Sequence, residues 1–281
     1  MRIEATDATL GAFIDDFDLR TIDRATWPAI EQAFHEHAVL VFPAQHLDEA
    51  EHLAFSRWFG PLERATAIAR PGQRADFTRL ANTDGDGAVV QDAESRVVRS
   101  LVGNQEWHSD SSFKRIAAKA SILTAVVVPA EGGETEFADM RAGYDALSAD
   151  EQQRVDGLVA EHSFAGDAYL TDAERKILAP VEHPIVQRHP ASGRRALFVG
   201  RHARSVVGLE AGVGRRLIDD LREEACRPPR IYTHRWSAGD VVVWDNRCVL
   251  HRGRPWDMAQ PRVMRRLTIA GDGDRNEWLL D

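Results

Sequence analysis

The stretch GDVVVWDNRCVLH, from Gly239 to His251, decides the fold. Three valines and a tryptophan at 241–244 predict a buried strand, and the Asp-Asn pair at 245–246 predicts a turn. The apolar residues 248–250 predict another strand that ends at His251. Short apolar strands separated by tight turns are typical of β-sandwiches and jelly rolls.

The same strand pattern recurs along the chain. We predict strands at 38–42, 121–128 and 265–270 and two short strands within 184–199. Helical spacing and capping signals predict helices at 26–37, 48–60, 148–160 and 212–226. The sequence therefore predicts a mainly β protein with flanking helices around a sandwich or jelly-roll core, with residues 1–281 as a single domain. The polar, glycine-punctuated segment 83–100 predicts a long surface loop that acts as a lid.

Composition narrows the class of protein. With 43% hydrophobic and 28% charged residues, the chain can build a sizeable core. Its net charge of -9 argues against nucleic-acid partners and anionic membranes. The first ten residues lack the features of a signal peptide, and no apolar run reaches membrane-spanning length, so we expect a cytoplasmic protein. Cys226 and Cys248 predict neither a disulfide framework nor a thiolate zinc site.

His108 and Asp110 form a His-x-Asp motif, a pattern that can bind a metal. On a strand, His108 and Asp110 would point to one face and present an imidazole and a carboxylate to one point. With His251 they would form a two-His, one-carboxylate facial triad, which leaves positions open on iron(II). The tripeptide alone is a weak signal, and His251 alone reads as a structural histidine.

A cluster of arginines follows His251 in this acidic chain. Arg262, Arg265 and Arg266 fall in and beside a predicted strand, and a guanidinium fork matches a carboxylate, sulfonate or sulfate. The alternative is a solvated basic edge. Residues 82–93 imitate the start of a calcium loop, but position twelve is Ala93, which favours an ordinary turn.

Five stretches together resemble one family. They are WHSDSSF (107–113), VPAEGGET (128–135), FADMR (137–141), GDVVVWDNR (239–247) and PRVM (261–264). The sequence is similar to the TauD/TfdA family of 2-oxoglutarate-dependent dioxygenases, nearest to its aryloxyalkanoate (phenoxy-herbicide) branch. Weaker similarity reaches back to residues 10–11 and 41–43. The resemblance implies a double-stranded β-helix (jelly-roll) core.

The resemblance also implies roles for individual residues. It makes His108, Asp110 and His251 the ligands of Fe(II), with 2-oxoglutarate and O2 as co-substrates. Thr135, 27 residues after His108, and Arg262, 11 after His251, would hold the distal carboxylate of 2-oxoglutarate. For the substrate, it implies contacts from Arg266 and Asn104, although Arg265 is an alternative to Arg266.

The implied reaction is hydroxylation of a small anionic organic substrate. An aryloxyalkanoate would be cleaved to a phenol and an oxo acid, with release of succinate and CO2. The alternatives are a taurine, alkylsulfonate or alkyl sulfate dioxygenase, a non-catalytic jelly roll that binds a metal or an organic acid, and a zinc hydrolase. The last two leave the spacing of Thr135 and Arg262 unexplained. The family also implies a homo-oligomer.

Overall fold

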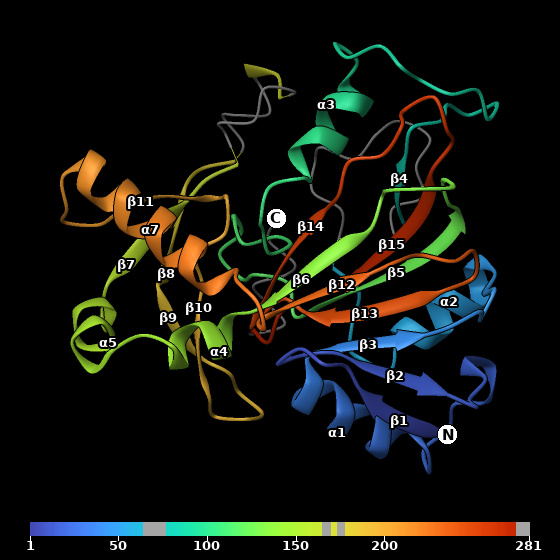
Figure 1. The fold of residues 1–281 in the computed structure, drawn as a ribbon, viewed down its shortest axis with the longest axis horizontal. Helices are drawn as coiled ribbons and strands as arrows, with labels where there is room; N and C mark the ends of the chain where they lie inside the picture. Colours follow the sequence, from blue (N-terminus) through green and yellow to red (C-terminus); the bar gives the residue numbers. More distant parts are fainter. Residues whose placement is uncertain (64–76, 165–169, 173–177, 274–281) are drawn as a thin grey trace.

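The computed structural model describes residues 1–63, 77–164, 170–172 and 178–273 (Figure 1). Its largest sheet has seven strands in the order β1-β2-β3-β13-β5-β15-β4. All neighbouring strands run antiparallel except β2 and β3. The bounds are β1 Arg2–Ala5, β2 Ala12–Asp15, β3 Val39–Phe42, β4 Thr78–Ala81, β5 Ala120–Val127, β13 Val241–Asp245 and β15 Val263–Ile269.

The continuous apolar run of β13 follows from its place at the centre of this sheet. Alternate residues of a strand face opposite sides. Val241 and Val243 pack in one hydrophobic cluster with helices α1 (Trp27–His37) and α2 (Glu49–Ser56). Val242 and Trp244 belong to a second cluster on the other side. A strand covered on both faces needs apolar residues at every position, as the sequence has.

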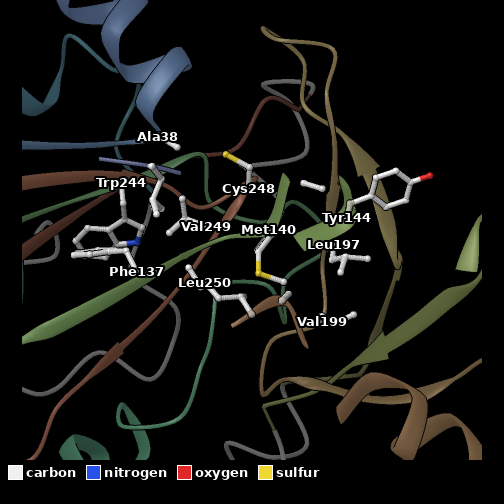
Figure 2. Packing of buried hydrophobic residues seen from close by; sticks show 14 of the residues in the cluster. Ala38, Phe137, Met140, Tyr144, Leu197, Val199, Trp244, Cys248, Val249 and Leu250 are labelled. Carbon is white, nitrogen blue, oxygen red and sulfur yellow. The ribbon is translucent and has the colours of Figure 1, made fainter. Parts of the chain in front are cut away.

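A smaller sheet faces this second side. It has the order β12-β6-β14, with bounds β12 Ile231–His234, β6 Thr135–Asp139 and β14 Val249–Gly253. Phe137 of β6 lies beside Trp244 of β13, with ring centroids 5.5 Å apart (Figure 2). The two sheets thus share a core, with helices outside, which is the predicted mainly β architecture.

A further layer lies beside the two sheets (Figure 1). It contains a three-stranded sheet β11-β7-β8 and a hairpin β9-β10, against which α4 and α7 pack. The remaining bounds are η1 Leu19–Thr21, α3 Arg96–Gly103, α4 Met140–Asp145, α5 Ala149–Val155, α7 Ala211–Ala225, β7 Val159–His162, β8 Val181–Pro184, β9 Val186–Arg188, β10 Arg195–Leu197 and β11 Ala203–Val206. Within the described ranges, no helix is long and apolar enough to cross a membrane.

Several predicted bounds are wrong. The helix expected at 148–160 ends at Val155 because Asp156 is extended and Gly157 has a φ of +80°, and β7 follows. The helix expected at 48–60 ends at Ser56. The segment 83–100 is a loop only to Ser95, whose side chain accepts a hydrogen bond from the backbone of Val98 and so starts α3.

Candidate metal centre and pocket

The three predicted ligands lie together. His108, Asp110 and His251 are each about 5% exposed, and one potential ligand atom from each lies within 4.8 Å of the others. His251 lies on β14, and His108 pairs with it through two backbone hydrogen bonds of 3.0 and 2.8 Å. The expectation that His108 and Asp110 share a strand is wrong. His108 forms an isolated bridge, and Asp110 begins a turn in which Ser111 has a φ of +54°.

Both imidazoles are oriented and neutral. Nδ1 of His108 lies 2.7 Å from the carbonyl of Glu106, which assigns it as the donor and leaves Nε2 as the lone-pair nitrogen. The ring of His251 packs 4.6 Å from that of Trp244. Burial lowers the pKa of His108 to about 4 and that of His251 well below its ordinary value. Neutral imidazoles are the form that binds metals.

The Asp110 carboxylate is ionised and held at both oxygens. Arg266 donates to Oδ1 at 2.5 Å, and the Ser121 hydroxyl donates to Oδ2 at 2.6 Å. Burial by itself would raise the pKa of Asp110, but the charge of Arg266 and the hydrogen bond from Ser121 oppose it, and the pKa is lowered to about 2. Two neutral imidazoles and one carboxylate are a suitable donor set for a divalent metal.

A pocket with about 530 Å³ of empty space, part of it open to solvent, lies beside this centre. Its wall is largely apolar, and Leu80 of β4, Leu101 of α3 and Leu123 of β5 contribute to it. Of the seven predicted site residues, all but Asp110 line it. The full lining is Leu80, Leu101, Asn104, Gln105, His108, Leu123, Thr135, Trp244, His251, Gly253, Arg254, Trp256, Arg262 and Arg266.

Arg262 and Thr135 are both buried in the wall of this pocket. Arg262 donates to the carbonyl of Gly133 at 3.0 Å and lies 5.2 Å from the ring of Trp256. Among the described residues, its Nε has no hydrogen-bond partner. Burial lowers the pKa of Arg262 to about 10, so it remains charged at neutral pH. A buried guanidinium with a spare donor suits an incoming carboxylate.

The structure distinguishes the two neighbouring arginines of β15. Arg266 lines the pocket, whereas Arg265 donates to the carbonyl of Leu47 at 3.0 Å, on the opposite face of the sheet. Arg266 is paired with Asp110, a contact that sequence reasoning did not anticipate. Asn104 lines the pocket as well, and its carbonyl accepts a hydrogen bond from Gly253. The roles assigned to Arg266 and Asn104 in substrate binding stay predictions.

A second cluster of His, Asp and Cys side chains is an ion-pair network. His189, Asp245 and Cys248 are buried together, although the sequence predicts no metal-type partner for His189. Arg247 donates to both oxygens of Asp245, at 2.8 and 2.6 Å, and His189 lies 2.9 Å from Oδ2. Burial raises the pKa of Cys248 well above its ordinary value. The positive charge of Arg247 already balances the negative charge of Asp245, as a bound metal ion otherwise would.

Comparison with known proteins identifies the fold and the family. The family model described as "Taurine catabolism dioxygenase TauD, TfdA family" matches residues 3–268 of this chain. This chain belongs to the TauD/TfdA family. A (S)-phenoxypropionate/alpha-ketoglutarate-dioxygenase of Sphingobium herbicidovorans is 41% identical over 283 residues, covering 96% of this chain and 95% of that protein. An alpha-ketoglutarate-dependent 2,4-dichlorophenoxyacetate dioxygenase of Cupriavidus pinatubonensis is 44% identical over 272 residues, covering 93% and 94%.

A solved structure agrees with this TauD/TfdA assignment. AAD-2, crystallised with Mn(II) and N-oxalylglycine, superposes with a TM-score of 0.88 at 36% identity and covers 97% of each chain. The predicted family, the jelly-roll fold class and the dioxygenase type of oxidoreductase are therefore confirmed.

Sequence reasoning gave no role to several residues around the TauD/TfdA centre. The sequence predicts only a turn at Asn246 and only the start of a strand at Ser121. Trp236 donates its indole hydrogen to Oγ1 of Thr135 at 2.9 Å, from 101 residues away. These partners come from distant segments, so local spacing carried no signal for them beyond the presence of Asn246 in the GDVVVWDNR stretch.

Proposed function

We propose that this chain is an iron(II)- and 2-oxoglutarate-dependent dioxygenase that hydroxylates small anionic substrates, with aryloxyalkanoates as the favoured class. One observation carries the proposal. The two histidines of the centre and a buried, charged Arg262 with an unused donor line one pocket, and Asp110 adjoins it. When bound, iron(II) and 2-oxoglutarate supply the activation of O2, and the reaction adds one oxygen atom to the substrate and releases succinate and CO2.

In this proposal Arg262 and Thr135 bind the distal carboxylate of 2-oxoglutarate. Because the indole of Trp236 already donates to Oγ1 of Thr135, the Thr135 hydroxyl hydrogen is left to donate to another acceptor. Arg262 adds a charge-assisted bond, and burial of both groups removes competing water. Together they would hold one end of the co-substrate in the pocket that His108 and His251 also line.

The proposed substrate combines an apolar ring with an anionic group. Leu80, Leu101 and Leu123 offer an apolar surface for the ring. Arg266 offers a cation beside the metal ligands for the carboxylate. Hydroxylation of the carbon next to the ether oxygen would give a hemiacetal, which collapses to a phenol and an oxo acid. The names of the relatives from Sphingobium and Cupriavidus support this class.

We propose that residues 1–281 form one dioxygenase domain with a lid at 83–100. That segment leads through α3 to Leu101 and Asn104 in the pocket wall, which supports a part in closing the pocket. The cytoplasmic location and the homo-oligomeric state stay predictions.

The test is anaerobic addition of iron(II) and 2-oxoglutarate, followed by O2 and a substrate panel. We expect a visible metal-to-ligand charge-transfer band that His108→Ala abolishes. A matched variant, His202→Gln, should keep the band, because His202 is also buried but bonds Ser112 and lies outside the ligand group. Failure of the wild-type protein to give a band would refute the proposal.

The panel decides the substrate class by succinate release. We expect turnover with an aryloxyalkanoate. Turnover with taurine, an alkylsulfonate or an alkyl sulfate alone would move the chain to that class. A band without turnover of any compound would favour a binding protein, and hydrolysis supported by zinc alone would favour a hydrolase.

A further inference from the structure

The three ligands of the metal centre are positioned in different ways. His251 lies within the ladder of β14, and His108 is fixed by two backbone hydrogen bonds to His251 and by the carbonyl of Glu106. Asp110 lies in a turn, outside any strand. Within the described part of the chain, its amide has one recorded partner, the side-chain oxygen of Asn246 at 3.1 Å. Asp110 therefore depends on side chains for its position.

Those side chains form a closed, buried network. Oδ1 of Asn246 accepts from the amide of Asp110 and from the indole of Trp244, at 3.1 and 3.0 Å. Nδ2 of Asn246 donates to the Ser121 hydroxyl at 3.0 Å, and this hydroxyl donates to Oδ2 of Asp110 at 2.6 Å. Ser121 is 0% exposed and Asn246 is 1% exposed, so no solvent replaces these partners.

The direction of each hydrogen bond in the network is determined. The amide of Asp110 and the indole of Trp244 can only donate, so the atom of Asn246 that faces both must be the oxygen. Its NH2 group must then face Ser121. Because the Ser121 hydroxyl accepts there, its single hydrogen is free to point at Asp110, whose ionised carboxylate can only accept. The network is consistent with one protonation state, in which Asp110 is a carboxylate.

We propose that Ser121 and Asn246 are positioning residues that hold the Asp110 carboxylate in its ligand orientation. The inference rests on the proposed metal-dependent function and adds two residues to it. Asn246 fixes the backbone of Asp110, and Ser121 fixes Oδ2, which lies 3.8 Å from Nε2 of His251 and keeps a further lone pair. Asn246 also accepts from Trp244, which packs on His251, so it links two ligands.

The test is metal affinity, measured from the electron paramagnetic resonance signal of free Mn(II) during titration. We expect Ser121→Ala to raise the Mn(II) Kd about 10- to 100-fold, the usual effect of losing a partner of a metal ligand. Ser121→Thr keeps the hydroxyl and should restore near-wild-type affinity. Asn246→Ala should weaken binding at least as much as Ser121→Ala. If Asn246→Ala does not fold, Ser121→Ala carries the test.

Ser56→Ala is the matched control. Ser56 is 0% exposed and its hydroxyl donates to the carbonyl of His52 at 2.8 Å on α2, outside the network around Asp110. It should leave the Mn(II) Kd close to that of the wild type. Equal weakening by Ser56→Ala and Ser121→Ala, or no weakening by Ser121→Ala, would overturn the role of Ser121. If the wild-type protein bound no Mn(II), the proposed metal-dependent function would be refuted. If the wild type bound Mn(II) and Ser121→Ala bound it equally well, only the role of Ser121 would be refuted.

Discussion

Replacing Arg262 should separate ligand binding from stability. Arg262→Met removes the cation but keeps an unbranched apolar chain of similar length. A hydrogen bond to a charged group contributes roughly 1.5–3 kcal/mol, so we expect N-oxalylglycine to bind about 10- to 150-fold more weakly in the presence of Mn(II). The weakening should be larger if both carboxylate oxygens are bonded.

The stability of the ligand-free protein should change in another way. A pKa lowered from 12.5 to about 10 corresponds to about 3 kcal/mol against the charged form in the folded state. That cost is fully present below pH 10 and disappears only as the pH rises past the unfolded pKa, so it applies in every ordinary buffer. Arg262→Met removes it, but also removes the charged hydrogen bond to Gly133, roughly 1.5–3 kcal/mol, and the contact with Trp256, on the order of 1 kcal/mol. The gain and the losses nearly cancel, so the free energy of unfolding of the ligand-free variant should stay within about 1 kcal/mol of the wild type.

Urea unfolding with and without ligand measures both effects. At 100 times the wild-type Kd, the ligand should raise the free energy of unfolding of the wild type by about 2.7 kcal/mol. A 100-fold weaker variant should gain only about 0.4 kcal/mol at the same concentration. Arg265→Met is the control, because Arg265 lies on the opposite face and should keep the full ligand effect. An unchanged ligand effect in Arg262→Met, or a ligand-free variant several kcal/mol less stable, would refute this reasoning.

Three further predictions follow from other parts of the molecule. Gly133→Ala should lower the free energy of unfolding in urea by about 1–2 kcal/mol, because Gly133 has a φ of +71°. It should also weaken the binding of N-oxalylglycine, because the new Cβ would lie 3.0 Å from Nε of Arg262. Gly87→Ala is the control: its φ is similar and no atom lies within 4 Å of the new Cβ, so it should show only the loss of stability. Burial lowers the pKa of His162 from 6.5 to about 3, so the folded state loses stability as the pH falls below 6.5. His162→Phe should therefore raise the free energy of unfolding in urea by about 2 kcal/mol more at pH 5 than at pH 8. Equal increases at the two pH values would contradict this prediction. Deleting 84–87, the tip of the predicted lid, should raise the substrate KM and leave the Mn(II) Kd unchanged, and unchanged steady-state kinetics would reject the lid.

The central strand and the metal ligands could be predicted because their signals are local or spaced along one motif. Four apolar residues in a row at 241–244 require burial on both faces, and the structure buries them between two clusters. His108, Asp110 and His251 were recognisable from residue type and family spacing. The strand geometry assigned to the first two was wrong, because a turn brings Asp110 to the same place that a strand would.

The pocket wall could not be predicted in the same way. Leu80, Leu101 and Leu123 come from β4, α3 and β5, and each has the pattern of an ordinary core leucine. Only the packing of these three elements leaves their side chains facing a cavity. For the same reason, Asn246 looked like a turn residue, although it contacts the amide of Asp110 from 136 positions away.

Arg266 shows how the site departs from a simple division of roles. The family resemblance assigns it to the substrate anion, yet it donates to Oδ1 of a metal ligand at 2.5 Å. One guanidinium can bond both Asp110 and a substrate anion, because it has five donor hydrogens and Oδ1 of Asp110 uses only one of them. An anion bound to Arg266 and the Asp110 carboxylate would then share the positive charge of the guanidinium. This sharing would weaken the attraction between Asp110 and Arg266. Because Ser121 still holds Oδ2, the orientation of Asp110 would not depend on whether the substrate is present.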